Sequence, residues 1–348
     1  MKSKLFAFFT LSILLLNSAV FAVADVKSRK AVDTAGIVAL LPASDAVVVV
    51  DTNRFLNSAL PQMLSGNQPM LAEVTQAIDD AKTRTGIDFR QFEYVAAGIT
   101  ATNVGPKKYD FDTVLVARGK VNAGALIAAA KLAANGKYRE EKIGERTVSI
   151  FEPTEVVQQN LPQGQAKKAG LISKIFGGKR EIAATALDGN TLVFGSVDKV
   201  RLALSGKSRV SPEITGLLSK TTAPVANFAA KVPGGMSAFL PLENDELGKQ
   251  VDSIQYLYGS MDVNATGTVL NATARTAQAV HATGLKDTLE GLQMLGKAFL
   301  GGASGADKQV YARLVENVKF TARGNEVTMD LAIAQADVNF LVGLLAKK

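Results

Sequence analysis

The sequence predicts an α+β fold of two related halves, in which antiparallel sheets carry helices packed on one face. Short runs with strand character come in pairs joined by tight turns, and helical patterns stand between the pairs. Strands joined in this way form antiparallel sheets, and the intervening helices cover one face of each sheet. The same order of elements occurs twice, which predicts a first half over residues 25–220 and a second half over 221–348.

The N-terminal end of the chain predicts export. A short basic region, 1–4, precedes an apolar core over 5–16, and small residues lead to Ala22-Val23-Ala24. This is the plan of a signal peptide, and it predicts cleavage after Ala24. An uncleaved anchor is the alternative, because 5–24 is just long enough to cross a bilayer. Both interpretations place the rest of the chain outside the cytoplasm, in the periplasm or in the medium.

The composition limits the classes of function. The 348 residues include no cysteine, which excludes disulfides, a lipid-modified cysteine and thiolate metal sites. The formal net charge of +7 falls to about +5 once Lys2 and Lys4 leave with the signal peptide. This mild excess permits attraction to anionic surfaces. Because an exported protein rarely meets nucleic acid, we expect no nucleic-acid partner.

Local patterns justify the elements of the first half. Four consecutive valines bounded by turn-forming residues predict a buried strand that ends at Asp51. Asn122 is placed to cap a helix of small residues, and Asp188-Gly189 predicts a two-residue hairpin turn. In order, we expect a strand over 47–51, a helix over 70–85, strands over 92–100 and 111–118, a helix over 123–134, and hairpins over 138–152 and 181–194.

The second half repeats this order. The stretches 112–126 and 267–280 start alike and each leads into a helix, which indicates a diverged internal duplication. The long helix after Gln278 takes its apolar residues from Val280, Leu285, Leu289 and Leu292. In order, we expect a strand over 225–231, a helix over 244–253, paired strands over 254–264 and 268–277, helices over 278–300 and 307–316, a hairpin over 318–333, and a terminal helix over 337–346 that buries Val338, Leu341, Leu344 and Leu345 on one side.

Two motifs between residues 196 and 208 can carry chemistry in other proteins. Ser196 and Lys199 form a Ser-x-x-Lys, in which the amine could accept the hydroxyl proton. The partner elements of the serine enzymes that use this pair are absent from the sequence, so we expect Ser196 to cap the helix 197–204. A Gly-Lys-Ser begins at Gly206, but it lacks the preceding glycine of a phosphate-binding loop and closes a helix instead of opening one.

No complete catalytic or metal-binding constellation can be assembled. His281 is the single histidine, and we expect it to be half-exposed on the long helix. Asp110 and Asp112 share one face of a strand and could bind Ca²⁺, but no calcium-loop pattern follows them. We therefore predict no catalytic residue, no cofactor and no metal.

A polar and then basic segment, 153–180, interrupts the first half. Its apolar residues have spacings that would share one helix face, so the segment could lie on an anionic membrane surface. The alternative is a mobile loop inserted between strands, which costs little entropy. The candidate membrane or partner contacts are Lys167, Lys168, Leu171, Ile172, Lys174, Ile175 and Phe176.

The stretch LPASDAVVVVDTNRFL over 41–56, together with LDGNTLVFGSVDKVRLAL over 187–204, resembles uncharacterised exported bacterial proteins. These proteins begin with a Leu-Pro, a short acidic step and a strand ending in Asp. Later they carry a hairpin, a Gly-Ser and a helix of Val-Arg-Ala-Leu type. The resemblance covers about a tenth of the chain and implies a bacterial, extracytoplasmic protein without enzymatic activity.

Together these observations favour an exported, non-enzymatic binding or scaffold protein. Its expected partner is a protein or another component of the cell envelope, with weak peripheral membrane contact as a further option. The alternative is an extracytoplasmic hydrolase that uses carboxylates or the pair of Ser196 and Lys199.

Overall fold

The structure is a computed structural model, which describes residues 34–85, 88–105, 108–152, 181–239, 245–302 and 305–346. The predicted signal peptide and the basic segment 153–180 lie outside the described residues. Within the described residues the chain is α+β, and each strand pair given below is antiparallel, as the sequence predicts.

The chain divides into two compact units. Unit 1 comprises residues 32–57 and 72–215, and unit 2 comprises 58–71 and 216–348, as far as these residues are described. Residues 58–71 belong to unit 2 although they fall in the range 25–220 expected for the first half. Hydrogen bonds account for their place, because Gln335 Nε2 donates to Gln62 O at 2.8 Å and Gly66 N donates to Asn339 Oδ1 at 3.2 Å.

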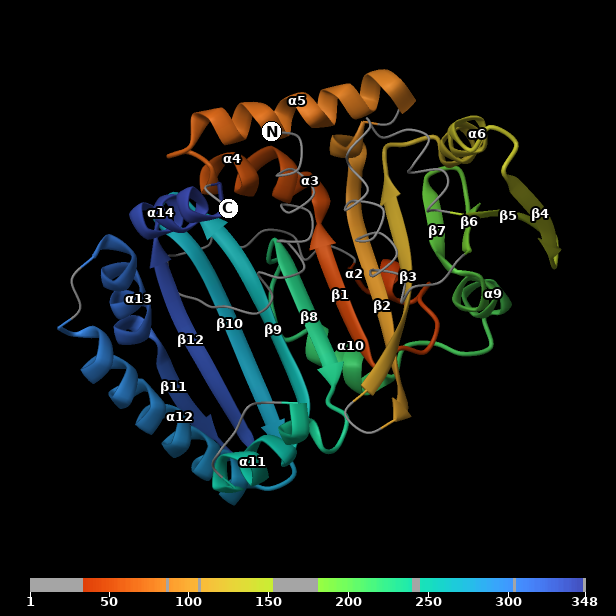
Figure 1. The fold of residues 1–348 in the computed structure, drawn as a ribbon. Coiled ribbons are helices and arrows are strands. Elements are labelled where there is room, and N and C mark those ends of the chain that lie inside the picture. The colour runs from red at the N-terminus through yellow and green to blue at the C-terminus, as the bar shows by residue number, and fades with distance from the viewer. Residues whose placement is uncertain are drawn as a thin grey trace. The chain divides into compact units, whose positions relative to one another are not determined.

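The strands of unit 1 follow the order β1-β2-β3-β7-β6-β5-β4 (Figure 1). The first three strands are consecutive in the chain, and β3 then pairs with the second strand of a later hairpin, Val114 opposite Gly195. The elements are α2 (Thr34–Val38), β1 (Ala46–Asp51), α3 (Thr52–Arg54), a 3-10 helix (Phe89–Gln91), β2 (Phe92–Gly105), β3 (Lys108–Gly119), α6 (Ala123–Ala133), β4 (Tyr138–Ile143), β5 (Arg146–Phe151), β6 (Ile182–Ala186), β7 (Thr191–Ser196) and α9 (Val197–Ser205).

Alternation of side chains along the strands builds the core of unit 1. Val47 and Val49 are buried on β1, and Val114 and Val116 are buried on β3, as the period of two requires. The helix α6 packs on a cluster that includes Phe92 of β2. The four-valine run therefore forms the strand that the sequence predicts, with every second valine fully buried.

The strands of unit 2 follow the order β8-β9-β10-β12-β11. Again three consecutive strands are followed by the second strand of a later hairpin, because β10 pairs with β12, Leu270 opposite Leu331. The elements are α4 (Leu60–Met63), β8 (Ala226–Lys231), a 3-10 helix (Met236–Phe239), α11 (Asp245–Asp252), β9 (Ile254–Asn264), β10 (Gly267–Thr276), α12 (Ala279–Leu300), α13 (Ala306–Asn317), β11 (Lys319–Arg323), β12 (Glu326–Ala334) and α14 (Gln335–Ala346).

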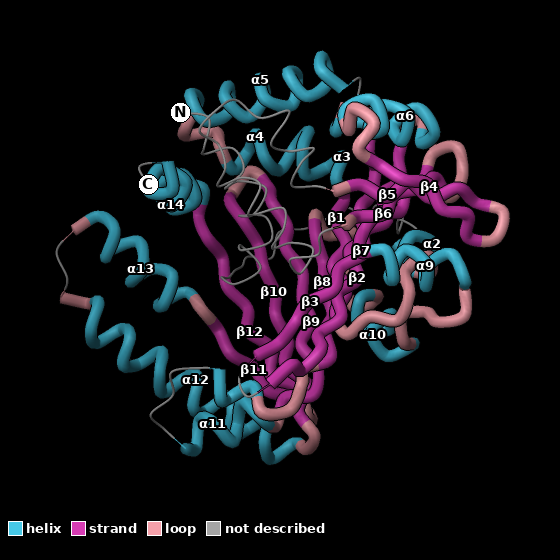
Figure 2. Tube along the Cα trace, turned by 45° about the vertical axis from the view of Figure 1, so that its right-hand side comes forward, coloured by secondary structure: helices cyan, strands magenta, loops and turns pink. Residues whose placement is uncertain are grey.

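Helices α12 and α13 lie beside β11 and β12 (Figure 2). Ala282 and Leu285 of α12 are buried against Val327 of β12, and Ala274 and Ala322 pack around them. This contact fixes the first half of α12 on the sheet of unit 2.

Most predicted elements agree with the structure to within a few residues, and the differences have physical causes. Strand β2 extends to Gly105 and strand β3 begins at Lys108. The two strands remain paired beyond residues 100 and 111, where the sequence predicts that they end and begin. Among the described residues, the sequence did not predict the helices α2, α3, α4 and α10 (Pro212–Leu218) or the π-helix over Phe55–Ala59. On α14, Val338 and Val342 are buried, whereas Leu341 and Leu344 are only half-buried. The remaining helix, α5 (Gln68–Thr85), and the π-helix span the boundary between the units in sequence.

Candidate functional site

Ser196 acts as the N-cap of α9. Its Oγ accepts a hydrogen bond from Lys199 N at 3.4 Å, and Asp198 stands in the first turn, where the helix dipole favours negative charge. Gly206 closes the helix with a left-handed φ of 66°. The stretch 196–208 therefore contains the two caps that the sequence predicts.

The Lys199 amine binds residues outside α9, at Ala43 before β1 and at Thr100 on β2. Its Nζ donates to Ala43 O at 3.3 Å and makes a short hydrogen bond to Thr100 Oγ1. Lys199 is 8% exposed, and burial lowers the pKa of its amine, while the carboxylates of Asp112 and Asp45 oppose that shift. The buried amine thus connects α9 by hydrogen bonds to the segment before β1 and to β2.

The two aspartates of the predicted calcium option lie on β3, Asp110 opposite Thr102 and Asp112 opposite Thr100. Among the described residues no group of three or more His, Asp or Glu side chains could hold a metal ion. Asp112 Oδ1 is buried without a hydrogen-bond partner, and the Asp112 carboxylate interacts electrostatically with the Lys199 amine.

His281 lies in the first turn of α12 and is half-buried, as the sequence predicts. The basic segment with Lys167, Lys168, Leu171, Ile172, Lys174, Ile175 and Phe176 lies outside the described residues. Its predicted membrane or partner contact stays a prediction.

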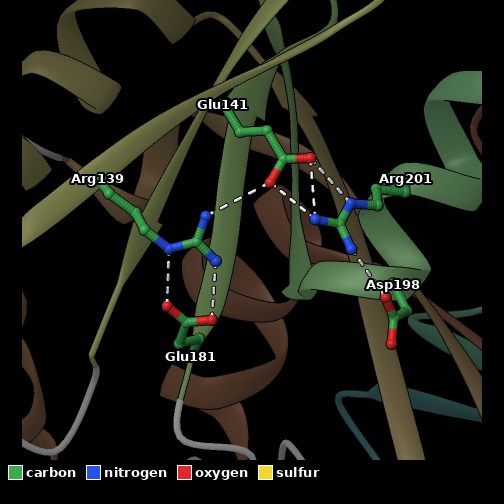
Figure 3. A network of polar contacts seen from close by, with 5 residues as sticks. All are labelled: Arg139, Glu141, Glu181, Asp198 and Arg201. Carbon is green, nitrogen blue, oxygen red and sulfur yellow. Dashed lines mark hydrogen bonds and ion pairs between the residues drawn. The ribbon is translucent and has the colours of Figure 1, made fainter.

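A network of charged side chains joins β4, the start of β6 and α9 on the surface of unit 1 (Figure 3). Arg201 donates from Nη2 to both oxygens of Glu141, at 2.9 and 2.7 Å. Arg139 donates to Glu181 from Nε and Nη2, both at 2.9 Å, and to Glu141 from Nη1 at 3.4 Å. The hydrogen bonds from Arg201 lower the pKa of Glu141. Arg139 and Arg201 are exposed, whereas Glu141 and Glu181 are half-buried. Because these four side chains pair with one another at the surface, we interpret the network as a support for the hairpin β4–β5.

A second polar cluster surrounds Glu326 in unit 2. Its carboxylate accepts hydrogen bonds from Lys220 Nζ at 2.8 Å, Arg275 Nε at 2.9 Å and Tyr258 OH at 3.0 Å. Burial tends to raise the pKa of Glu326, but these donors outweigh burial and hold the pKa below its ordinary value. The cluster connects β9, β10 and β12 through side-chain hydrogen bonds, so we interpret it as stabilising the sheet of unit 2.

The most unusual surface is the outer side of the second half of α12. Leu292, Met294, Leu295 and Phe299 are 48%, 71%, 67% and 90% exposed. We call these four residues the α12 apolar face. Leu292, Leu295 and Phe299 recur at steps of three and four and share one side of the helix, and Met294 precedes Leu295 at the edge of that side. Large apolar side chains exposed one by one are ordinary, but a group of them at neighbouring positions marks a candidate interaction site.

Polar contacts hold the opposite side of this helix segment against the protein. Gln293 Nε2 donates to Val315 O and Val318 O, each at 2.7 Å. Gly296 lies against Val315, whose Cγ1 would be 3.1 Å from an added Cβ. The helix therefore presents a glutamine and a glycine inward and the α12 apolar face outward.

Sequence reasoning found the helix but not this surface. Val280 and Leu292, which the sequence groups with Leu285 and Leu289, are exposed, and only Leu285 is buried. The signal was present in the sequence: from Leu292 to Leu300 apolar residues cover about two thirds of the helix circumference, so some of them must face outward.

Among the described helices, none combines the length and the apolar character needed to cross a bilayer. No protein-family model and no curated protein matches the chain. Among solved structures, crystal form I of TP0453 is similar over 89% of this chain and 97% of that chain, with 8% sequence identity and a TM-score of 0.42. Crystal form IV of TP0453 is similar over 89% of this chain and 96% of that chain, with 10% identity and a TM-score of 0.42.

Proposed function

We propose that this chain is an exported, non-enzymatic binding protein that acts through the α12 apolar face. The observation that carries the proposal is the exposure of Leu292, Met294, Leu295 and Phe299 together on one helix segment. Leaving these side chains in water costs free energy: full burial of one Leu, Met or Phe side chain contributes about 1.5–3 kcal/mol. A partner that covers this surface would recover part of that free energy.

The state of the polar candidates supports a binding role. Ser196 is engaged as a helix cap, and Lys199 is engaged with Ala43 O and Thr100. The Lys199 amine donates to Ala43 O and Thr100 Oγ1, while Ser196 Oγ accepts from the backbone N–H of Lys199. This arrangement gives no support to a proton transfer from the hydroxyl to the amine.

We also propose that the two units arose by duplication of one ancestral unit. The support is the shared strand order, in which β1-β2-β3-β7-β6 corresponds to β8-β9-β10-β12-β11. A short helix precedes the first strand of each series, α2 before β1 and α10 before β8. The alternative, independent origin of the two units, predicts no such correspondence.

Sedimentation of gently lysed host cells on a density gradient tests the binding role. We expect the parent chain to migrate with a larger particle, and the double variant Leu295→Asp, Phe299→Asp to migrate as free protein. Leu132→Asp is the matched control, because Leu132 is 82% exposed on α6 but has no large exposed apolar neighbour on that helix. The proposal fails if the parent chain and the double variant both migrate as free protein.

The mass of the N-terminus of the same material tests export. A chain that starts at Asp25 supports cleavage after Ala24, whereas a chain that keeps Met1 and stays with the membranes supports the anchor.

A further inference from the structure

We infer that the α12 apolar face docks on the surface of an anionic lipid bilayer. This inference rests on the proposed function and names the partner of the same surface. Four features of the described residues carry it: the position of the apolar side chains, the fixed rotation of the helix, the chemistry of the exposed groups and the charge beside them.

The outer side of α12 changes character along its length. In the first half it exposes Val280, Thr283 and Asp287. In the second half the same side continues through Gly291, Leu295 and Ala298, all of them exposed. One large apolar side chain is thus exposed in the first half and four in the second, so the second half carries the denser apolar group.

The helix cannot turn this surface inward without losing other contacts. Rotation would break the two hydrogen bonds from Gln293 Nε2 to Val315 O and Val318 O. It would also replace Gly296 by a larger side chain at the contact with Val315. The outward direction of Leu295 and Phe299 is thus fixed by the packing of the unit.

The exposed groups suit lipid better than a protein partner. The four side chains of the α12 apolar face carry no hydrogen-bond donor, so the face lacks the Tyr, Trp and Arg in which protein interfaces concentrate binding energy, although Phe and Met occur in such interfaces too. From Leu292 to Phe299 the helix rises about 10 Å, which matches a segment that lies in the plane of the interface. A surface this short is small for a stable pair of identical chains.

The charge beside the face complements anionic headgroups. Between Gly291 and Gly302 the single charged residue is Lys297, which is exposed. A lysine on such a helix can extend its amine to the headgroup level while its methylene stem stays with the apolar side chains. No carboxylate lies within that segment. The exposed Asp287 precedes it on the same helix, as does Glu290, which pairs with Lys286 at 2.6 Å.

Flotation of the purified full chain with vesicles tests the inference. The vesicles are phosphatidylcholine with about one third phosphatidylglycerol, an anionic surface of the kind that attracts basic residues. We expect the parent chain to float and the double variant Leu295→Asp, Phe299→Asp to lose at least about tenfold in bound fraction. Lys297→Gln should lose about fivefold on these vesicles and nothing on pure phosphatidylcholine.

Two control variants separate the α12 apolar face from general apolar exposure. Leu132→Asp on α6 and Val280→Asp at the other end of α12 replace exposed apolar residues elsewhere. Both should bind vesicles as the parent chain does. Equal loss in all variants would overturn the inference, because it would show a general effect of added negative charge.

The remaining outcomes distinguish this inference from the proposed function. If the chain ignores vesicles but the double variant still alters sedimentation of the cell lysate, the partner is a protein and the lipid inference fails alone. A parent dimer that the double variant converts to a monomer would identify a second copy as the occupant and also overturn it. If vesicle binding survives the double variant and is lost on deletion of 165–179, the contact belongs to the basic segment.

Discussion

The two units share their strand order but differ in what connects the third strand to the last hairpin. In unit 1 the connection is α6 followed by the hairpin β4–β5, whose exposed residues are mostly charged. In unit 2 the connection is α12 and α13, and it exposes Leu, Met and Phe. Because the strand order is the same, the difference shows that the connection, not the sheet, gives each unit its own surface.

The charged surface of β4 and the α12 apolar face also differ in whether their side chains have partners within their own unit. The charges of β4 find partners in the same unit, as Glu141 does with Arg201. The α12 apolar face has no such possibility, because an apolar group is satisfied only by being covered. The proposed binding surface thus lies on unit 2, whereas the charged surface of unit 1 pairs within its own unit.

The largest expected effect on stability is the difference between substitutions on the buried side and on the exposed side of α12. Leu285→Ala should lower the free energy of unfolding by about 3 kcal/mol, because Leu285 is 3% exposed and packs on Val327. Leu295→Ala should change it by no more than about 0.5 kcal/mol, because its side chain is already in water. Urea unfolding followed by far-UV circular dichroism measures both values, and equal losses would show that Leu295 is packed in solution.

The next effect concerns the polar cluster of unit 2. Glu326→Gln should cost about 2 kcal/mol at neutral pH, because it removes the charge that Lys220 and Arg275 face. The pKa of Glu326 is lowered in the folded chain, so its contribution is complete above the ordinary carboxyl value and is lost as the pH falls through the folded value. The stability of the parent chain should thus fall more steeply between about pH 5 and pH 3 than that of the variant.

A control for this pH dependence is Glu316→Gln. Glu316 is exposed on α13 in the same unit. If this variant flattens the pH curve as much as Glu326→Gln does, the dependence comes from general charge and not from the cluster.

Helix caps provide a smaller contrast. Ser196 caps α9 and Asn122 caps α6 in unit 1, whereas Gln278 makes no side-chain hydrogen bond at the N-cap of α12. Ser196→Ala and Asn122→Ala should each cost about 1 kcal/mol, and Gln278→Ala should cost less than about 0.5 kcal/mol. Thermal unfolding of the three variants measures the order. A loss for Gln278→Ala as large as the other two would mean that this side chain caps α12 in solution.

The smallest effect is expected in the charged network of unit 1. Glu141→Gln should shift the unfolding midpoint less than any destabilising change above, because exposed ion pairs contribute little and are screened by salt. The comparison is made at low and at high salt. A large shift that persists at high salt would show that the hairpin β4–β5 depends on Glu141.

The sequence by itself determined the elements, since their causes are local. The caps Asn122 and Ser196, the C-cap Gly206 and the turn at Asp188-Gly189 depend on residues within a few positions of one another. Periodicity gave the strands and the long helix for the same reason. The short helices α2 and α4 were not predicted, because helices this short depend on tertiary packing more than on their own residues.

Only the tertiary structure decided which side of each element is covered. Pairing of β3 with β7 and of β10 with β12 joins residues far apart in the chain, and no local pattern sets it. The direction of the Lys199 amine depends on Ala43 and Thr100, which are distant in sequence. On α12, apolar residues cover about two thirds of the circumference of the second half. The carbonyls of Val315 and Val318, which bind Gln293, therefore decide that Leu295 and Phe299 face outward.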